Sequence, residues 1–364
     1  MSETRASARI DLGAIRHNAT RLARAAGRAQ LIAVVKANGY GHGAAHVAEA
    51  ALAAGATRLA VATTVEAQTL RDAGINAPLQ VMGPLHIAEF ALARQLGVEV
   101  TIWTPEAATA AISAGVAVHL KFDTGMGRLG AQRGQVDALV AAATSANVVG
   151  LMTHFATADE RNGANAGFMN EQLVRFRALL GEIRSGFPGA IAHAANSAAT
   201  LRSPDATFDA VRCGIALYGC SPFGTDPADD DLRPALTLRS WVASLKDISS
   251  QESVGYGRAY RAMRGTTTAL IPVGYADGYP RRLGNRAEVL VGGRRVPVVG
   301  NISMDQLTID LGPESNAAIG DEVVLIGPQG DHHIGVEEVA GWLDTISYEV
   351  ICAIGPRVVR EWTG

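Results

Sequence analysis

The chain contains few cysteines and no long segment without polar side chains. Its three cysteines, Cys213, Cys220 and Cys352, include no Cys-x-x-Cys pair. They are too few for a disulfide framework, so we expect a reducing compartment. The longest segment without Asp, Glu, Lys or Arg, residues 138–158, carries several Thr, Ser and Asn side chains and is a poor membrane span. The N-terminal residues show no signal-peptide pattern, and we therefore expect a cytoplasmic protein.

The chain also lacks an excess of either charge. Lys and Arg number 32 against 35 Asp and Glu, a net charge of −3, and a nucleic-acid-binding protein would need a basic face instead. Hydrophobic residues make up 48% and charged residues only 18%, which excludes a disordered chain. At 364 residues the sequence predicts two or three domains.

The first two-thirds of the sequence alternates short apolar runs with Ala-rich helical patterns. Such alternation predicts a parallel sheet covered by helices, and eight repeats fit a closed (β/α)8 TIM-type barrel better than an open doubly wound sheet. We assign this barrel to residues 1–230. The expected strands are residues 31–36, 58–62, 79–82, 98–103, 116–123, 148–154, 190–195 and 210–216.

Beyond the acidic run at residues 229–231 the pattern changes to short alternating runs. Gly292-Gly293 between two of them is a two-residue hairpin signal. We therefore expect a C-terminal antiparallel β domain over residues 231–364. Its expected strands are residues 236–245, 266–271, 288–291, 295–299, 307–310 and 322–326.

Polar residues follow several of the expected barrel strands, and barrel enzymes work at that end of their strands. Lys36 follows the apolar run Leu-Ile-Ala-Val-Val. Burial there would lower the pKa of its amine and suit a nucleophile or a Schiff-base lysine. A lysine that merely extends its amine into water at a strand end is the alternative.

Two other patterns admit a structural and a functional interpretation. Ser197 and Gly214-Ile215 follow the last two strands, where barrels often bind phosphate, although loop glycines and a helix-capping serine are equally ordinary. His332-His333 beside Asp331 has no Cys or spaced His partner, so we expect a solvated hairpin turn and no metal site.

Taken together, these segments resemble one family, the fold-type III pyridoxal-phosphate alanine racemases. The most specific matches are AVVKANGYGHG at residues 33–43, KFDTGMGRLG at residues 121–130 and THFATAD at residues 153–159. Further matches follow in family order, among them Asn196-Ser197, Arg212-Cys213-Gly214-Ile215, Gly255-Tyr256, Met304-Asp305-Gln306 and Tyr348-Glu349-Val350.

The resemblance implies a cofactor, pyridoxal 5′-phosphate, attached to Lys36. It implies that Arg212 faces the pyridine nitrogen and that His154 belongs to a chain linking Arg212 to Tyr256. Arg128 should contact the cofactor's phenolic oxygen and the substrate, and Lys121 should carry a carbamate that faces Arg128. The remaining cofactor-binding residues implied by the family are Tyr40, Asn196, Ser197, Gly214, Ile215 and Tyr348.

The resemblance also implies the reaction, which is interconversion of L-alanine and D-alanine by two bases, Lys36 and Tyr256. Racemisation removes a proton from one face of Cα and delivers one to the other, so two opposed bases suit it. Tyr256, and Met304 at the substrate carboxylate, should come from the partner subunit of a head-to-tail homodimer. The product would serve peptidoglycan synthesis, or the enzyme would serve alanine catabolism.

Three alternatives to alanine racemisation differ in their required features. A broader-specificity racemase would share every motif. A decarboxylase of the same plan would place an acid, not Arg212, at the pyridine nitrogen. A non-enzymatic cofactor-binding protein of the same barrel type would lack the β domain and Tyr256.

Overall fold

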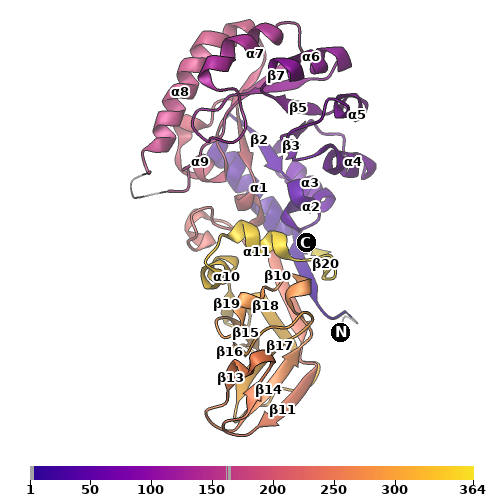
Figure 1. The fold of residues 1–364 in the computed structure, drawn as a ribbon, viewed down its shortest axis with the longest axis vertical. Helices are drawn as coiled ribbons and strands as arrows, with labels where there is room; N and C mark the ends of the chain where they lie inside the picture. The colour runs from indigo at the N-terminus through magenta and orange to yellow at the C-terminus, as the bar shows by residue number, and fades with distance from the viewer. Residues whose placement is uncertain (1–3, 161, 163–164) are drawn as a thin grey trace. The chain divides into compact units, whose positions relative to one another are not determined.

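The computed structural model describes residues 4–160, 162 and 165–364, which form two compact units. One unit spans Ile15–Arg233, and the other joins the described residues through Ala14 to Pro234–Gly364. Figure 1 shows the first as a barrel surrounded by helices and the second as a β domain with two short helices.

The first unit is a closed barrel of eight parallel strands in the order β2 to β9. Pairing of β2 with β9, with Ile32 opposite Arg212, closes the ring. Each strand lies within or overlaps one of the predicted runs, so the predicted (β/α)8 barrel is confirmed. The strands are β2 Gln30–Val34, β3 Ala56–Val61, β4 Leu79–Val81, β5 Glu99–Ile102, β6 Val118–Lys121, β7 Val148–Met152, β8 Ile191–His193 and β9 Ala210–Cys213.

Local sequence sets the ends of the covering helices. Thr63 and Glu66 form a reciprocal capping box at the start of α4, and α6 begins with the N-cap Thr104 and ends at Gly115 with φ of 64°. The helices of this unit are α1 Leu12–Ala26, which begins just before it, α2 Lys36–Tyr40, α3 Ala44–Ala53, α4 Thr64–Asp72, α5 Glu89–Gln95, α6 Pro105–Ala114, α7 Val136–Ala142, α8 Phe168–Ile183 and α9 Ser197–Arg202.

The second unit is built on a mostly antiparallel sheet with the strand order β11-β14-β17-β16-β15-β18-β10-β1-β20. Gly292 and Gly293 connect β15 to β16 with φ of 56° and 71°, the paired positive angles of a tight hairpin turn. The predicted antiparallel domain is thus confirmed. Its main strands are β10 Leu236–Trp241, β11 Ser244–Ile248, β14 Thr266–Ile271, β15 Glu288–Val291, β16 Arg294–Val299, β17 Leu307–Gly312 and β18 Glu322–Gln329.

The structure differs from the sequence-based division in three respects. Strand β1 (Ser7–Asp11) pairs with β10 and with β20 (Val359–Thr363), so residues 7–11 belong to the sheet and not to the barrel. The run predicted at residues 236–245 is two strands, β10 and β11. Two short helices, α10 (Val336–Leu343) and α11 (Ser347–Ala353), follow the last predicted strand.

Candidate active site

The chain makes a left-handed turn directly after strand β2, at Lys36. Ala37, Asn38 and Gly39 all have φ between 52° and 62° and ψ between 46° and 49°, and Tyr40 has φ of 50°. Consecutive left-handed residues cost about 1–2 kcal/mol each for residues with a Cβ, so the surrounding structure must hold them there. Such local strain is characteristic of functional sites.

Side chains of neighbouring elements hold this turn in place. Glu66 of α4 accepts a hydrogen bond from the backbone N–H of Ala37 at 2.6 Å and also binds the N–H of Ala62 at 2.7 Å. Asn38 Oδ1 accepts from the N–H of Ala44 at 3.0 Å. Lys36 is half-buried at the start of the turn, and Tyr40 is buried at its end. The turn therefore fixes both predicted site residues.

Ser197, Gly214 and Tyr40 form a small polar cradle at the ends of β8, β9 and β2. Ser197 Oγ accepts from the N–H of Gly214 at 3.0 Å and from that of Ala216 at 3.3 Å, which leaves its own O–H to donate. A Cβ on Gly214 would lie 2.4 Å from the Tyr40 hydroxyl, so only glycine admits that hydroxyl. In the described part of the chain the N–H of Ile215 has no acceptor.

Asn196, next to this cradle, has a structural role. Its side chain caps α9 by accepting from the N–H of Ala199 at 3.0 Å. The helix cap considered for Ser197 is therefore made by Asn196, and Ser197 is the residue that contacts the loop of Gly214.

Arg212 is buried in β9, with both terminal nitrogens hydrogen-bonded. Nη1 donates to His193 Nδ1 at 2.7 Å. Nη2 donates to the carbonyls of Thr153 at 2.7 Å and Ala194 at 3.0 Å, and to His154 Nδ1 at 3.2 Å. Burial lowers the pKa of Arg212 to about 10, which still leaves it protonated at neutral pH. Its Nε–H takes part in none of these bonds.

The contact with Arg212 also fixes the protonation of His154. Because an arginine only donates, His154 Nδ1 must accept, and the ring proton of neutral His154 is on Nε2. Burial and the charge of Arg212, with smaller effects from Lys121, Arg128 and Lys36, hold the pKa of His154 well below its usual value. His154 is therefore a neutral donor through Nε2.

Lys121 lies buried at the end of β6 among other cations. Burial lowers its pKa to about 8, and the charges of Arg212, Arg128 and Lys36 act in the same direction, against Asp123. Arg128, in the exposed loop that follows, has no ion-pair partner in the described part of the chain. Lys121 and Arg128 therefore lie close enough to influence each other electrostatically.

Replacing Lys121 with methionine should stabilise the protein in CO2-free buffer. Because the folded state lowers the pKa of Lys121 from 10.5 to about 8, the protonated amine destabilises the fold by about 3 kcal/mol below pH 8. This cost fades as the pH rises from 8 towards 10.5, so the gain from methionine should fade with it. Denaturant unfolding across this range measures the difference, and a variant less stable than the parent below pH 8 would contradict it.

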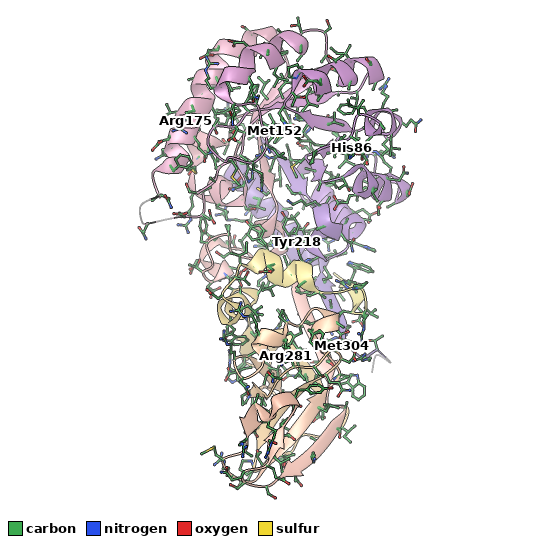
Figure 2. The ribbon with its side chains drawn as sticks, viewed as in Figure 1. His86, Met152, Arg175, Tyr218, Arg281 and Met304 are labelled. Atoms are coloured by element: carbon green, nitrogen blue, oxygen red, sulfur yellow. The ribbon has the colours of Figure 1, made fainter. Side chains whose placement is uncertain are left out.

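Tyr256 and Met304 lie in the C-terminal unit, where they line the same open hollow of about 780 Å³. Tyr256, between two glycines with φ of 72° and 70°, is 74% exposed, and Met304 (Figure 2) is 53% exposed. A Cβ on Gly274 would lie 2.3 Å from the Met304 carbonyl, so this glycine lets the Met304 loop pack closely. Tyr348, the third predicted residue of this unit, is half-buried in α11.

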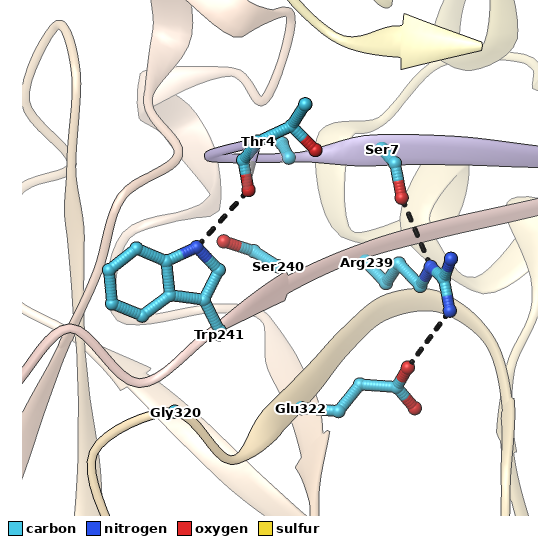
Figure 3. Close-up of a pocket in the computed structure, with 8 residues that line it drawn as sticks. Thr4, Ser7, Arg239, Ser240, Trp241, Gly320 and Glu322 are labelled. Atoms are coloured by element: carbon cyan, nitrogen blue, oxygen red, sulfur yellow. Dashed lines mark hydrogen bonds and ion pairs between the residues drawn. The ribbon is translucent and has the colours of Figure 1, made fainter. Parts of the chain in front are cut away.

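A second hollow of the same unit, of about 330 Å³, contains none of the predicted site residues. Figure 3 shows its hydrogen bonds, in which Arg239 joins Ser7 of β1 to Glu322 of β18 and Trp241 Nε1 donates to the carbonyl of Thr4. Its polar groups are thus engaged in holding strands together.

His332 and His333 are exposed beside a tight hairpin, and no group of three or more potential metal ligands occurs in the described ranges. Among the helices that the structure describes, none has the length and hydropathy needed to cross a membrane.

The reactive groups gathered at the strand ends of a closed parallel barrel define a barrel enzyme. Comparison with known proteins is more specific. Residues 10–222 match the family model "Alanine racemase, N-terminal domain", and residues 235–362 match "Alanine racemase, C-terminal domain". The chain belongs to the alanine racemase family and is an isomerase, which confirms the resemblance predicted from its motifs.

Individual relatives match over almost their whole length. An alanine racemase of Symbiobacterium thermophilum is 44% identical over 98% of this chain and 97% of its own. The crystal structure of the alanine racemase from D-cycloserine-producing Streptomyces lavendulae has a TM-score of 0.92 at 37% identity, covering 100% of this chain and 98% of that one. The Bacillus anthracis enzyme with bound L-Ala-P has a TM-score of 0.91 at 39% identity, covering 100% and 96%.

Proposed function

We propose that the chain interconverts L- and D-alanine with pyridoxal 5′-phosphate held at the mouth of the barrel, using Lys36 and the partner subunit's Tyr256 as its two bases. The family is dependent on this cofactor. The observation that carries the proposal is Arg212, whose Nη1 and Nη2 are tied to the barrel while Nε–H remains to donate to a ring nitrogen.

The residues at the barrel mouth fit the cofactor. Lys36 would attach it. The cradle of Ser197, Gly214 and Tyr40, with the adjacent Ile215, offers a phosphate the O–H of Ser197 and the N–H of Ile215, which has no acceptor among the described residues. Tyr348 is proposed as a further phosphate ligand, and Asn196 acts by capping the helix that carries Ser197. When bound, the cofactor supplies an electron sink that acidifies the Cα–H of the amino acid joined to it.

Arg212 limits how strongly that electron sink acts. A guanidinium with a pKa of about 10 donates a hydrogen bond to the pyridine nitrogen but does not readily give up its proton. A weaker sink favours prompt return of a proton to Cα over its misplacement on the cofactor. We therefore propose that Arg212 suppresses transamination.

The exposed position of Tyr256 supports a site shared between two copies of the chain. Tyr256, Tyr275 and Met304 are large side chains, all exposed and lining one hollow, a pattern typical of an interaction surface. We propose that this surface meets the barrel mouth of a second copy in a homodimer. There the partner subunit's Tyr256 would receive the Nε2–H of His154, and the partner's Met304 would contact the substrate carboxylate.

We propose that Lys121 is carbamylated. Its lowered pKa, about 8, keeps a fraction of the amine neutral and able to add CO2, with release of a proton. The product is an anion beside Arg128, so two facing cations become an ion pair that can orient Arg128 towards the cofactor's phenolic oxygen and the substrate.

Borohydride reduction followed by peptide mapping tests the cofactor assignment. The chain has only three lysines, Lys36, Lys121 and Lys246, so the reduced cofactor can be located without ambiguity. We expect it on Lys36, and we expect D-alanine from L-alanine in the untreated sample. Cofactor on another lysine, or racemisation without cofactor, would refute the proposal.

A broader-specificity racemase is the second candidate function, because every site residue described above would serve a larger amino acid equally well.

We propose a cytoplasmic location. The three cysteines are free, in keeping with a reducing compartment. There the product would supply D-alanine for peptidoglycan, or the enzyme would serve alanine catabolism.

A further inference from the structure

Four polar side chains inside the barrel extend from Arg212 away from the proposed chemistry. His193 Nε2 lies 2.8 Å from His119 Nδ1, and His119 Nε2 lies 2.8 Å from Glu99 Oε2. Glu99 is in turn bound through both oxygens by Arg58. With the bond from Arg212 to His193, these contacts form one unbroken chain across strands β9, β8, β6, β5 and β3. Both imidazoles are fully buried.

The hydrogen-bond partners determine where each proton in this chain lies. Arg212 only donates, so His193 Nδ1 accepts and the His193 proton is on Nε2. His193 then donates to His119 Nδ1, which puts the His119 proton on Nε2, where it is donated to Glu99. Burial lowers the pKa of both histidines, and nearby arginines act in the same direction. Glu99 opposes this effect at His119 but does not reverse it, in agreement with neutral rings.

A glycine opposite His119 makes room for this arrangement. Gly150 of β7 pairs in register with His119, and a Cβ on Gly150 would lie 2.0 Å from His119 Nδ1. The φ of Gly150 is not positive, so its backbone would accept another residue. Space for the imidazole is the physical reason for a glycine at this position.

Among the described residues, Glu99 is the carboxylate to which the hydrogen-bond chain from Arg212 leads. Among the described residues no carboxylate pairs with Arg212 directly, and its acceptors are two imidazoles and two backbone carbonyls. A buried cation is costly unless it is compensated. By accepting a proton from His119, Glu99 makes the acceptor nitrogen of His119 more electron-rich. His193 is polarised in turn, so its Nδ1 becomes a stronger acceptor for the guanidinium of Arg212.

We propose that Glu99, His119 and His193 form a positioning relay that keeps His193 an acceptor, and thereby holds Arg212 with Nε–H directed at the pyridine nitrogen of the cofactor. The inference rests on the proposed function. Loss of the relay would let Arg212 turn away, and more of the bound alanine would be transaminated. In that side reaction the Cα proton moves to the cofactor's aldehyde carbon, and water then releases pyruvate while the amino group stays on the cofactor.

Two substitutions interrupt the relay at different points. In Glu99→Leu the carboxylate that accepts the Nε2–H of His119 is removed, so no side chain at position 99 holds the His119 proton on Nε2. In Gly150→Ala the new methyl displaces the His119 ring. Gly181→Ala in α8 is the matched control, because a Cβ there meets no atom within 4 Å.

Side-chain NMR of 15N-histidine-labelled protein measures the tautomer and protonation state of His119 and His193 independently of enzyme activity. In the parent and in Gly181→Ala, His119 and His193 should be Nε2–H tautomers that stay neutral at about pH 7 and above. Both relay variants should lose the Nε2–H signal of His193. They should also form roughly tenfold more pyruvate per D-alanine, the effect of losing one hydrogen bond to a charged group.

A parent protein whose His193 is cationic or an Nδ1–H tautomer would overturn the relay, whether or not either variant folds. So would variants that fold, by circular dichroism, yet match the control in both the tautomer and the pyruvate ratio. Failure of the proposed function is a separate outcome, because it appears as cofactor attached away from Lys36 in the peptide map.

Discussion

Replacing Lys36 with alanine will abolish covalent attachment of the cofactor and reduce racemisation by roughly ten-thousand-fold or more. The reason is that Lys36 has two proposed roles, attachment of the cofactor and proton transfer at one face of Cα. The left-handed turn that follows Lys36 is held by backbone contacts and by Glu66, so the substitution leaves its supports intact. Absorption spectroscopy of the purified variant and a D-alanine assay measure both losses.

Lys246→Ala is the matched control for this experiment. Lys246 is exposed in strand β11 of the C-terminal sheet and is not one of the proposed site residues. Its replacement should leave both the absorption spectrum and the activity unchanged. Substantial racemisation by the Lys36 variant would show that Lys36 is not the residue on which the chemistry depends, and loss of activity in the Lys246 variant would show that the effect is not specific to Lys36.

Replacing Tyr256 with phenylalanine will remove one of the two bases and leave the other. The equilibrium constant between mirror-image alanines is unity, so kcat/KM must fall equally in both directions and cannot reveal which base was lost. Exchange of the Cα proton with D2O does reveal it. Exchange from one enantiomer, through Lys36, should persist in the variant, while exchange from the other should fall by about a hundredfold or more.

Mixing the Lys36→Ala and Tyr256→Phe variants provides a second readout of the same prediction. Neither homodimer is active, but a mixed dimer has one site with Lys36 from one subunit and the partner subunit's Tyr256 intact. Random exchange of subunits should therefore restore about a quarter of the parent activity. No recovery after confirmed subunit exchange, or equal loss of exchange from both enantiomers, would contradict a shared two-base site.

The fold could be predicted because each barrel strand is a short apolar run between helical patterns. Strand β1 has an alternating pattern, in which Ala8 and Ile10 are buried while Arg9 and Asp11 are exposed. It was not predicted because it is short and stands next to the long helix α1. Its position in the sheet depends on pairing with β10 and β20, partners more than two hundred residues away. Local pattern carries no information on such pairing.

The candidate site was predicted in part, from residues that end strands and from family motifs. The proton arrangement around Arg212 was not, because it depends on His119 and His193, which are 74 residues apart in sequence and lie inside strands. The left-handed turn at Ala37–Tyr40 also gave no signal beyond the glycines around it, and its support by Glu66 comes from the next helix but one. The cofactor and substrate roles of the individual residues stay predictions.

The close approach of Gly150 to His119 has a consequence for natural variation in the family. The two positions compete for one volume, so a relative with a side chain at the first cannot keep an imidazole in the same rotamer at the second. In an alignment of many members, alanine or serine at position 150 should therefore accompany a smaller residue at position 119. Coevolution of positions 119 and 150 would show that this steric constraint has acted during the evolution of the family, which a single sequence does not reveal.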